Sequence, residues 1–126
     1  LSAGVYKYQP AAHALLPWLD DDLADELMGA ALSQPYIREA AANLVFTAVY
    51  ERTRTRYGYR AAQYVHMEAG HASQNVYLQA QALGLGTVAI GAFEDAQVKH
   101  ILALPADEEP LYIMPLGRPR LSGRGP

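Results

Sequence analysis

The segment from Ala61 to Leu83 constrains this chain most, because it carries the longest helical pattern in the sequence. Apolar and small residues recur at helical spacing along more than one face of it. A helix that is apolar around most of its circumference is normally buried on most sides. We therefore expect either the central helix of a domain or a helix at a subunit interface. Gly84 follows at once and predicts termination by a left-handed residue.

Shorter patterns predict strands and helices on both sides of this helix. Val5 to Tyr8 alternates, and residues 13–19 supply the return strand of a hairpin. Asp20 to Asp22 mark a helix start, where carboxylates suit the unpaired N–H groups. The remaining expectations are a helix at 35–42, a buried strand at 44–50, a polar connection at 51–60, a strand at 87–91, a helix at 94–104, a strand at 111–116 and a tail at 117–126. Together they predict an α+β fold.

Composition limits the class of protein. The chain has 126 residues, 51% of them hydrophobic, which fits one domain spanning 1–126 with a sizeable core. Its net charge of −3 argues against a nucleic-acid binder, and the absence of cysteine excludes thiolate nucleophiles and cysteine zinc sites. There is no secretory signal and no apolar run near the roughly 18 residues of a membrane span. We therefore expect a soluble, cytoplasmic protein with no membrane partner.

Two apparent motifs do not have the geometry of a functional site. His66 and His71 are five residues apart, so they point in different directions on a helix and do not form a zinc pair. The run Gly84-Leu85-Gly86 follows a helix and precedes a strand. A dinucleotide-binding loop needs the opposite order, so we predict neither a metal site nor a Rossmann phosphate site.

A run of arginines and tyrosines lies between the predicted strand at 44–50 and the long helix. Such a run can bind phosphates and stack on bases, but the acidic chain favours a solvated loop or a lid over a site. The residues concerned are Arg52, Arg54, Arg56, Tyr57, Tyr59 and Arg60.

The order of several motifs resembles the SagB-type dehydrogenases, which belong to the nitroreductase-like FMN-dependent oxidoreductases. The resemblance covers residues 4–119 and points to a family rather than to a substrate. Its motifs are Gly4 to Leu15, Glu68 to His71, Gln74 to Leu78, Ala82 to Gly86, Gly91 to Phe93 and Pro110 to Pro119.

The resemblance implies a mostly antiparallel sheet flanked by helices, with a long buried central helix, in a homodimer that binds FMN between its subunits. It implies that Ala89, Ile90, Gly91 and Ala92 line the flavin ring, where small residues admit a close backbone approach. It also implies that Arg118 or Arg120 pairs with the FMN phosphate.

The chain departs from the family pattern in two places. It begins after the family's Arg-Ser-x-Arg segment and a following strand, so we expect an N-terminally truncated form of the fold. Azoline-oxidising relatives carry a Lys-Tyr pair where this chain has Arg56-Tyr57. Arginine does not give up a proton as a desolvated lysine does, so peptide-azoline oxidation is disfavoured and Tyr57 remains as the proton donor or acceptor.

Three functional hypotheses follow. The first is an FMN-dependent oxidoreductase in which NADH or NADPH reduces the flavin and a small organic or peptide substrate exchanges electrons with it. The second is a flavin-less relic that acts as a dimerisation or partner-binding domain. The third, binding of nucleic acid through the arginine and tyrosine run, is the most distant.

Overall fold

A three-stranded antiparallel sheet forms the middle of the computed structural model, which describes residues 1–120. Its order is β3 (Ala42–Ala48), β5 (Glu109–Gly117), β4 (Gly86–Thr87), so β5 is the central strand. Val45 lies opposite Ile113, and Gly86 lies opposite Gly117. Apolar and β-branched residues dominate both long strands. The strand predicted at 44–50 forms as β3, but its predicted burial is wrong, because none of its residues is buried and Leu44 is exposed.

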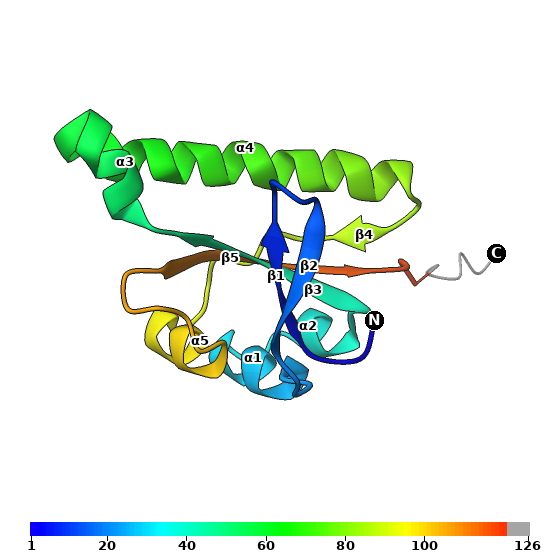
Figure 1. Cartoon of the computed structure of the whole chain (residues 1–126). Coiled ribbons are helices and arrows are strands. Elements are labelled where there is room, and N and C mark those ends of the chain that lie inside the picture. The colour runs from blue at the N-terminus through cyan, green and yellow to red at the C-terminus, as the bar shows by residue number, and fades with distance from the viewer. Residues whose placement is uncertain (121–126) are drawn as a thin grey trace.

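Helices cover the sheet on two sides (Figure 1). The long helix α4 (Ala61–Ala82) runs along one face, and three short helices lie on the other. These are α1 (Ala24–Ala30), α2 (Pro35–Glu39) and α5 (Asp95–Ile101). The structure is therefore an α+β fold with an antiparallel sheet flanked by helices, as the sequence and the resemblance implied.

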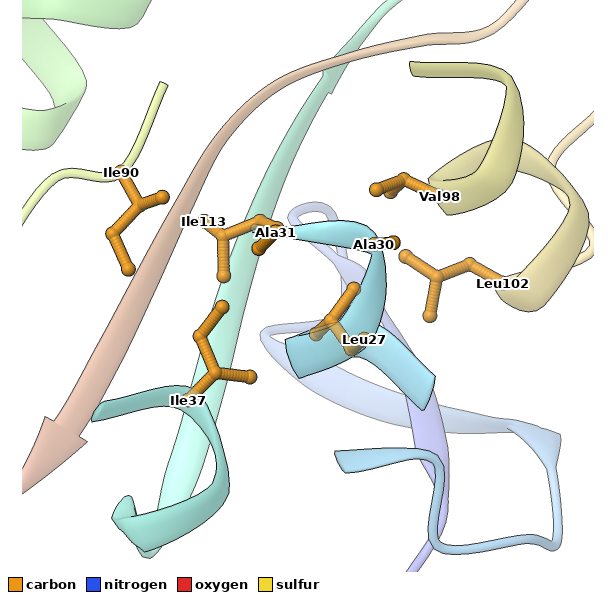
Figure 2. Close-up of a cluster of buried hydrophobic side chains, with 8 residues drawn as sticks. All are labelled: Leu27, Ala30, Ala31, Ile37, Ile90, Val98, Leu102 and Ile113. Carbon is orange, nitrogen blue, oxygen red and sulfur yellow. The ribbon is translucent and has the colours of Figure 1, made fainter. Parts of the chain in front are cut away.

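The hydrophobic core lies between the sheet and the three short helices (Figure 2). Ile113 of β5 and Ile37 of α2 have no exposed surface at their centre. The other buried members are Leu27, Ala30, Ala31, Ile90, Val98 and Leu102. Burial of large aliphatic side chains is the main favourable contribution to folding of a chain this size.

The N-terminal hairpin forms as predicted, from β1 (Val5–Gln9) and β2 (Ala14–Leu19). It stands in front of the sheet and crosses it (Figure 1). The Trp18 indole N–H donates a hydrogen bond of 2.8 Å to the Leu102 carbonyl, and the Lys7 ammonium lies 4.0 Å from the Trp18 ring centroid. The bond to Leu102 attaches the two-stranded sheet to the end of α5, whereas the Lys7–Trp18 contact joins the two strands of the hairpin.

The polar connection predicted at 51–60 is wrong, because this segment is helical. Helix α3 (Tyr50–Tyr57) is followed by a 3-10 turn, Gly58–Arg60. Glu51 lies in the first turn and Arg54 in the last, where each suits the helix dipole, and they form an ion pair of 3.4 Å. Gly58 ends the helix with a φ of 56°.

Two other expectations need adjustment. Helix α1 starts at Ala24 and has no side-chain cap from its N-cap residue Leu23, although Asp22 accepts a hydrogen bond of 3.2 Å from the Ala24 N–H. The strand predicted at 87–91 is only β4, followed by a single bridge at Ile90. The predicted tail lies partly outside the described residues.

Helix α4 has the predicted length, and Gly84 follows it with the expected left-handed φ of 69°. Its predicted burial is wrong for the single chain. Only Ala61, Ser73 and Ala80 are buried, whereas apolar side chains such as Leu78 and Leu83 are more than 60% exposed. One face packs on the sheet, and the apolar residues elsewhere on the helix are uncovered.

Among residues 1–120, no helix is long and apolar enough to cross a membrane.

We predict that Ile113→Ala lowers the free energy of unfolding by about 2–5 kcal/mol, because it removes a buried side chain and leaves a cavity in the core. Urea denaturation followed by circular dichroism measures the change. Leu32→Ala, at a 62% exposed position, is the matched control and should cost less than about 1 kcal/mol. Equal losses in the two variants would contradict this placement of the core.

Candidate functional site

A loop of residues 88–92 leads from β4 toward α5 beneath helix α4 (Figure 1). Ile90 fixes its middle: the Ile90 N–H donates to the Ile113 carbonyl at 2.8 Å, and the Ile113 N–H donates back at 3.0 Å. The Ala89 N–H donates to the Tyr77 hydroxyl at 2.7 Å. The Gln34 amide donates to the Ala92 carbonyl at 3.2 Å. The loop is therefore held from β5, α4 and the segment before α2.

Two successive residues at the end of this loop, Gly91 and Ala92, carry N–H groups without an acceptor among residues 1–120. Within the described residues, neither the Gly91 N–H nor the Ala92 N–H donates a hydrogen bond, and both residues are exposed. Buried backbone donors are almost always paired, so free ones are found where water or a ligand can reach. Two successive free N–H groups on a firmly held loop can donate to a ligand that carries partial negative charge.

The strand-end cavity, of about 520 Å³, lies where β4 meets the end of β5. Val88 lines it and so joins it to the 88–92 loop. Arg118 and Arg120 line it as well, both exposed, and Arg120 pairs with Glu39 at 3.2 Å. Exposed ion pairs contribute little, so Arg120 is free to exchange Glu39 for an anionic ligand.

Thr87 adds an unusual feature to the strand-end cavity. Its hydroxyl is buried and has no hydrogen-bond partner in the part of the chain that the structure describes, although the residue lines the cavity. An unpaired buried hydroxyl normally costs about 1–3 kcal/mol, so its presence beside two arginines favours a polar ligand there. The sequence did not identify Thr87, because a threonine in a short strand carries no signal of being unpaired.

The helix cavity, of about 700 Å³, lies between α3, α4 and strand β3. The Tyr57 and Tyr64 rings meet edge to face at its wall, with centroids 5.0 Å apart. Glu68 and His71 of α4 also line it. It therefore combines aromatic walls with titratable side chains.

The two histidines that the sequence analysis considered, His66 and His71, have different surroundings in the structure. The His66 ring nitrogen Nε2 lies 2.7 Å from the Tyr50 hydroxyl, whereas His71 lines the helix cavity. Burial raises the pKa of the Tyr50 phenol, and the Glu109 and Asp95 carboxylates raise it further. Tyr50 therefore stays protonated at neutral pH beside His66 and ties the start of α3 to α4.

The 88–92 loop contributes to the strand-end cavity and contacts the central strand of the sheet. Val88 lines the strand-end cavity, and a Cβ added at Gly91 would lie 3.5 Å from the Tyr112 ring. Tyr112 is paired in the sheet with Phe46, which lines the helix cavity. The loop thus adjoins the strand-end cavity, which Arg118 and Arg120 line, whereas Tyr57 lies in the helix cavity; among residues 1–120 the two cavities share no lining residue.

Ile90 differs from its predicted neighbours in the loop. Its side chain is buried in the core, and both of its backbone hydrogen-bonding groups are taken by Ile113. It therefore positions the loop, while Gly91 and Ala92 offer the free donors. Tyr77 and Gln34, which also hold the loop, were not found from the sequence, because their partners are distant backbone groups.

Two proteins described as a nitroreductase or a flavin oxidoreductase are similar to this chain in sequence. A candidate nitroreductase of Methanocaldococcus jannaschii is 50% identical over 115 residues, which are 91% of this chain and 57% of that protein. An NADPH-flavin oxidoreductase of Vibrio harveyi is 34% identical over 108 residues, which are 79% of this chain and 45% of that protein. The chain therefore spans about half the length of these relatives.

Solved structures share the fold. That of a candidate nitroreductase from Anabaena variabilis matches 95% of this chain and 25% of its own, with a TM-score of 0.89 and 41% identity. An NADPH:FMN oxidoreductase from Vibrio harveyi, solved with NAD+, matches 77% of this chain and 46% of its own, with a TM-score of 0.66 and 33% identity. The Nitroreductase family model matches residues 2–118. This chain belongs to the nitroreductase family.

Proposed function

We propose that this chain binds FMN along the 88–92 loop and acts in an FMN-dependent oxidoreductase that takes electrons from NADH or NADPH. The observation that carries the proposal is the pair of free N–H groups at Gly91 and Ala92, held beside a cavity that contains two arginines. The family and the Vibrio harveyi relatives support the same chemistry.

The residues present fit the cofactor. Arg118 and Arg120 supply forked donors for a phosphate, and the unpaired Thr87 hydroxyl supplies another donor in the same cavity. Bound FMN would supply the two-electron chemistry, accepting hydride from the nicotinamide and passing the electron pair on. The Gly91 and Ala92 N–H groups would stabilise negative charge that develops on the ring edge. Ala89 and Ile90 would hold the loop against α4 and β5.

Tyr57 would hold the proton for the substrate. Its ring lines the helix cavity beside Tyr64, and it is half exposed, so a substrate in the cavity can reach it. The adjacent Arg56 does not fit the Lys-Tyr pair of azoline-oxidising enzymes. We therefore propose reduction of a small organic substrate rather than oxidation of a peptide azoline.

A homodimer is part of the proposal. The exposed apolar side chains of α4, including Met67, Leu78 and Leu83, would be covered by a second copy. The same exposed surface favours a second candidate function, a partner-binding domain without flavin. The two differ in whether the chain binds FMN.

We predict that Thr87→Val stabilises the flavin-free chain by about 1 kcal/mol, because the substitution removes an unpaired buried hydroxyl. The same substitution should weaken FMN binding by about tenfold, because the phosphate loses a donor. Thermal unfolding and FMN titration measure the two effects, and Thr87→Ser is the control that keeps the hydroxyl. A variant with unchanged stability and unchanged FMN affinity would show that Thr87 has no part in the site.

We predict that Tyr57→Phe lowers the turnover of a nitroaromatic acceptor by roughly 100-fold, because the proton donor is lost. Reduction of the flavin by NADPH, followed alone by stopped-flow absorbance, should be unchanged, because that half-reaction does not use the phenol. Tyr8→Phe, on the distant hairpin, is the matched control. If both half-reactions of Tyr57→Phe kept wild-type rates, Tyr57 would not be the proton donor.

A further inference from the structure

Arginine and tyrosine side chains alternate where α3 meets α4, and we call Arg56, Tyr57, Arg60 and Tyr64 the Arg–Tyr cluster. The Arg56 guanidinium lies 5.4 Å from the Tyr57 ring centroid, and the Arg60 guanidinium lies 5.5 Å from that of Tyr64. The Arg60 Nε–H also donates to the Tyr64 hydroxyl at 3.2 Å. These contacts preorganise two guanidinium groups at the surface.

The cluster carries positive charge that no carboxylate neutralises. Within residues 1–120, the ion pairs of α3 include Arg54, which is paired with Glu51, but neither Arg56 nor Arg60. The whole chain is acidic, with a net charge of −3, so this local excess of positive charge is not a general property of its surface. Two unpaired, stacked guanidinium groups are suited to bind a phosphate by several hydrogen bonds.

The residues around the Arg–Tyr cluster indicate which chemical groups, besides a phosphate, a ligand bound there would contain. Tyr59 lies between the two arginines in sequence and is 92% exposed, so its ring is available to stack on a base. Tyr57 and Tyr64 also line the helix cavity, so a ligand held at the cluster can extend into about 700 Å³ of space. A dinucleotide has the three parts that this site would accept: a phosphate, a flat base beside it and a further group that can enter the cavity.

We propose that Arg56 and Arg60 bind the 2′-phosphate of NADPH, with the adenine against Tyr59, and thereby select NADPH over NADH. This inference rests on the proposed function, because it assigns the electron donor of the same oxidoreductase. Arg60 donates from its Nε to Tyr64, and a guanidinium carries five N–H donors, so further donors remain for the phosphate. The 2′-phosphate and the adenine belong to the same nucleoside, which matches the adjacent positions of Arg60 and Tyr59 in the chain.

Isothermal titration of the full chain with 2′,5′-ADP and with 5′-AMP tests the inference. In the wild type, 2′,5′-ADP should bind at least about tenfold tighter, because only it carries the 2′-phosphate. In the double variant Arg56→Gln/Arg60→Gln the preference should fall below about threefold. Arg54→Gln removes one positive charge from α3, the helix that carries Arg56, and should keep the wild-type preference, because Arg54 is already paired with Glu51.

Any of three results of these titrations would overturn the inference: no preference in the wild type, an unchanged preference in the double variant, or an equal loss of preference in Arg54→Gln. Arg60→Lys, which keeps the charge but not the fork, provides a variant that should fold if the double variant does not. The preference of Arg60→Lys for 2′,5′-ADP over 5′-AMP should fall below that of the wild type. Displacement of bound 2′,5′-ADP by a lower concentration of a single-stranded oligonucleotide would also overturn it, in favour of a nucleic-acid site.

Failure of the inference and failure of the proposed function are distinguishable, because the titration needs no flavin. A chain that binds FMN and oxidises NADPH, but whose double variant still prefers 2′,5′-ADP, would retain the function and lose the inference. A chain that binds 2′,5′-ADP through Arg56 and Arg60, but takes up no FMN, would retain the inference and lose the proposed function.

Discussion

The pair of hydrogen bonds between Ile90 and Ile113 is the interaction on which the candidate site depends. Ile113 lies on the central strand and has no exposed surface, so it is among the least mobile positions of the fold. Its two bonds to Ile90 hold the middle of the 88–92 loop against that strand. Because Ile90 uses both of its own backbone groups, Gly91 and Ala92 follow with N–H groups that are placed but unpaired. Rigidity of the loop and availability of its donors thus have one cause.

Helix α4 joins the two functions that a flavoprotein of this fold would need. One side of the helix provides Tyr77, which holds the loop, and another side provides Glu68 and His71, which line the helix cavity. Apolar residues of the same helix are exposed in the single chain, which is unusual unless they meet another surface. A partner that covered them would shape the site as well, because the same helix lines the helix cavity. This is why dimerisation and cofactor binding belong to one proposal.

Much of the fold could be predicted from patterns, because strands, the hairpin and α4 are marked by apolar periodicity and by Gly84. Helix α3 could not, since its arginines and threonines form no apolar face and none of its residues is buried, so the apolar periodicity that marks the other elements is absent. The exposure of α4 was missed because core helices and interface helices share the same pattern. Of the site, the 88–92 loop came from the family resemblance, whereas Thr87 required knowledge of which buried hydroxyl lacks a partner.

FMN binding by the purified chain tests the central claim most directly. The flavin-free chain would be titrated with FMN, with binding read from quenching of flavin fluorescence and the mass of the complex from light scattering. The account predicts saturation at one FMN per chain in a particle of two chains. Unchanged flavin fluorescence in excess FMN would contradict it, and would leave the exposed surface of α4 as the basis of a partner-binding function.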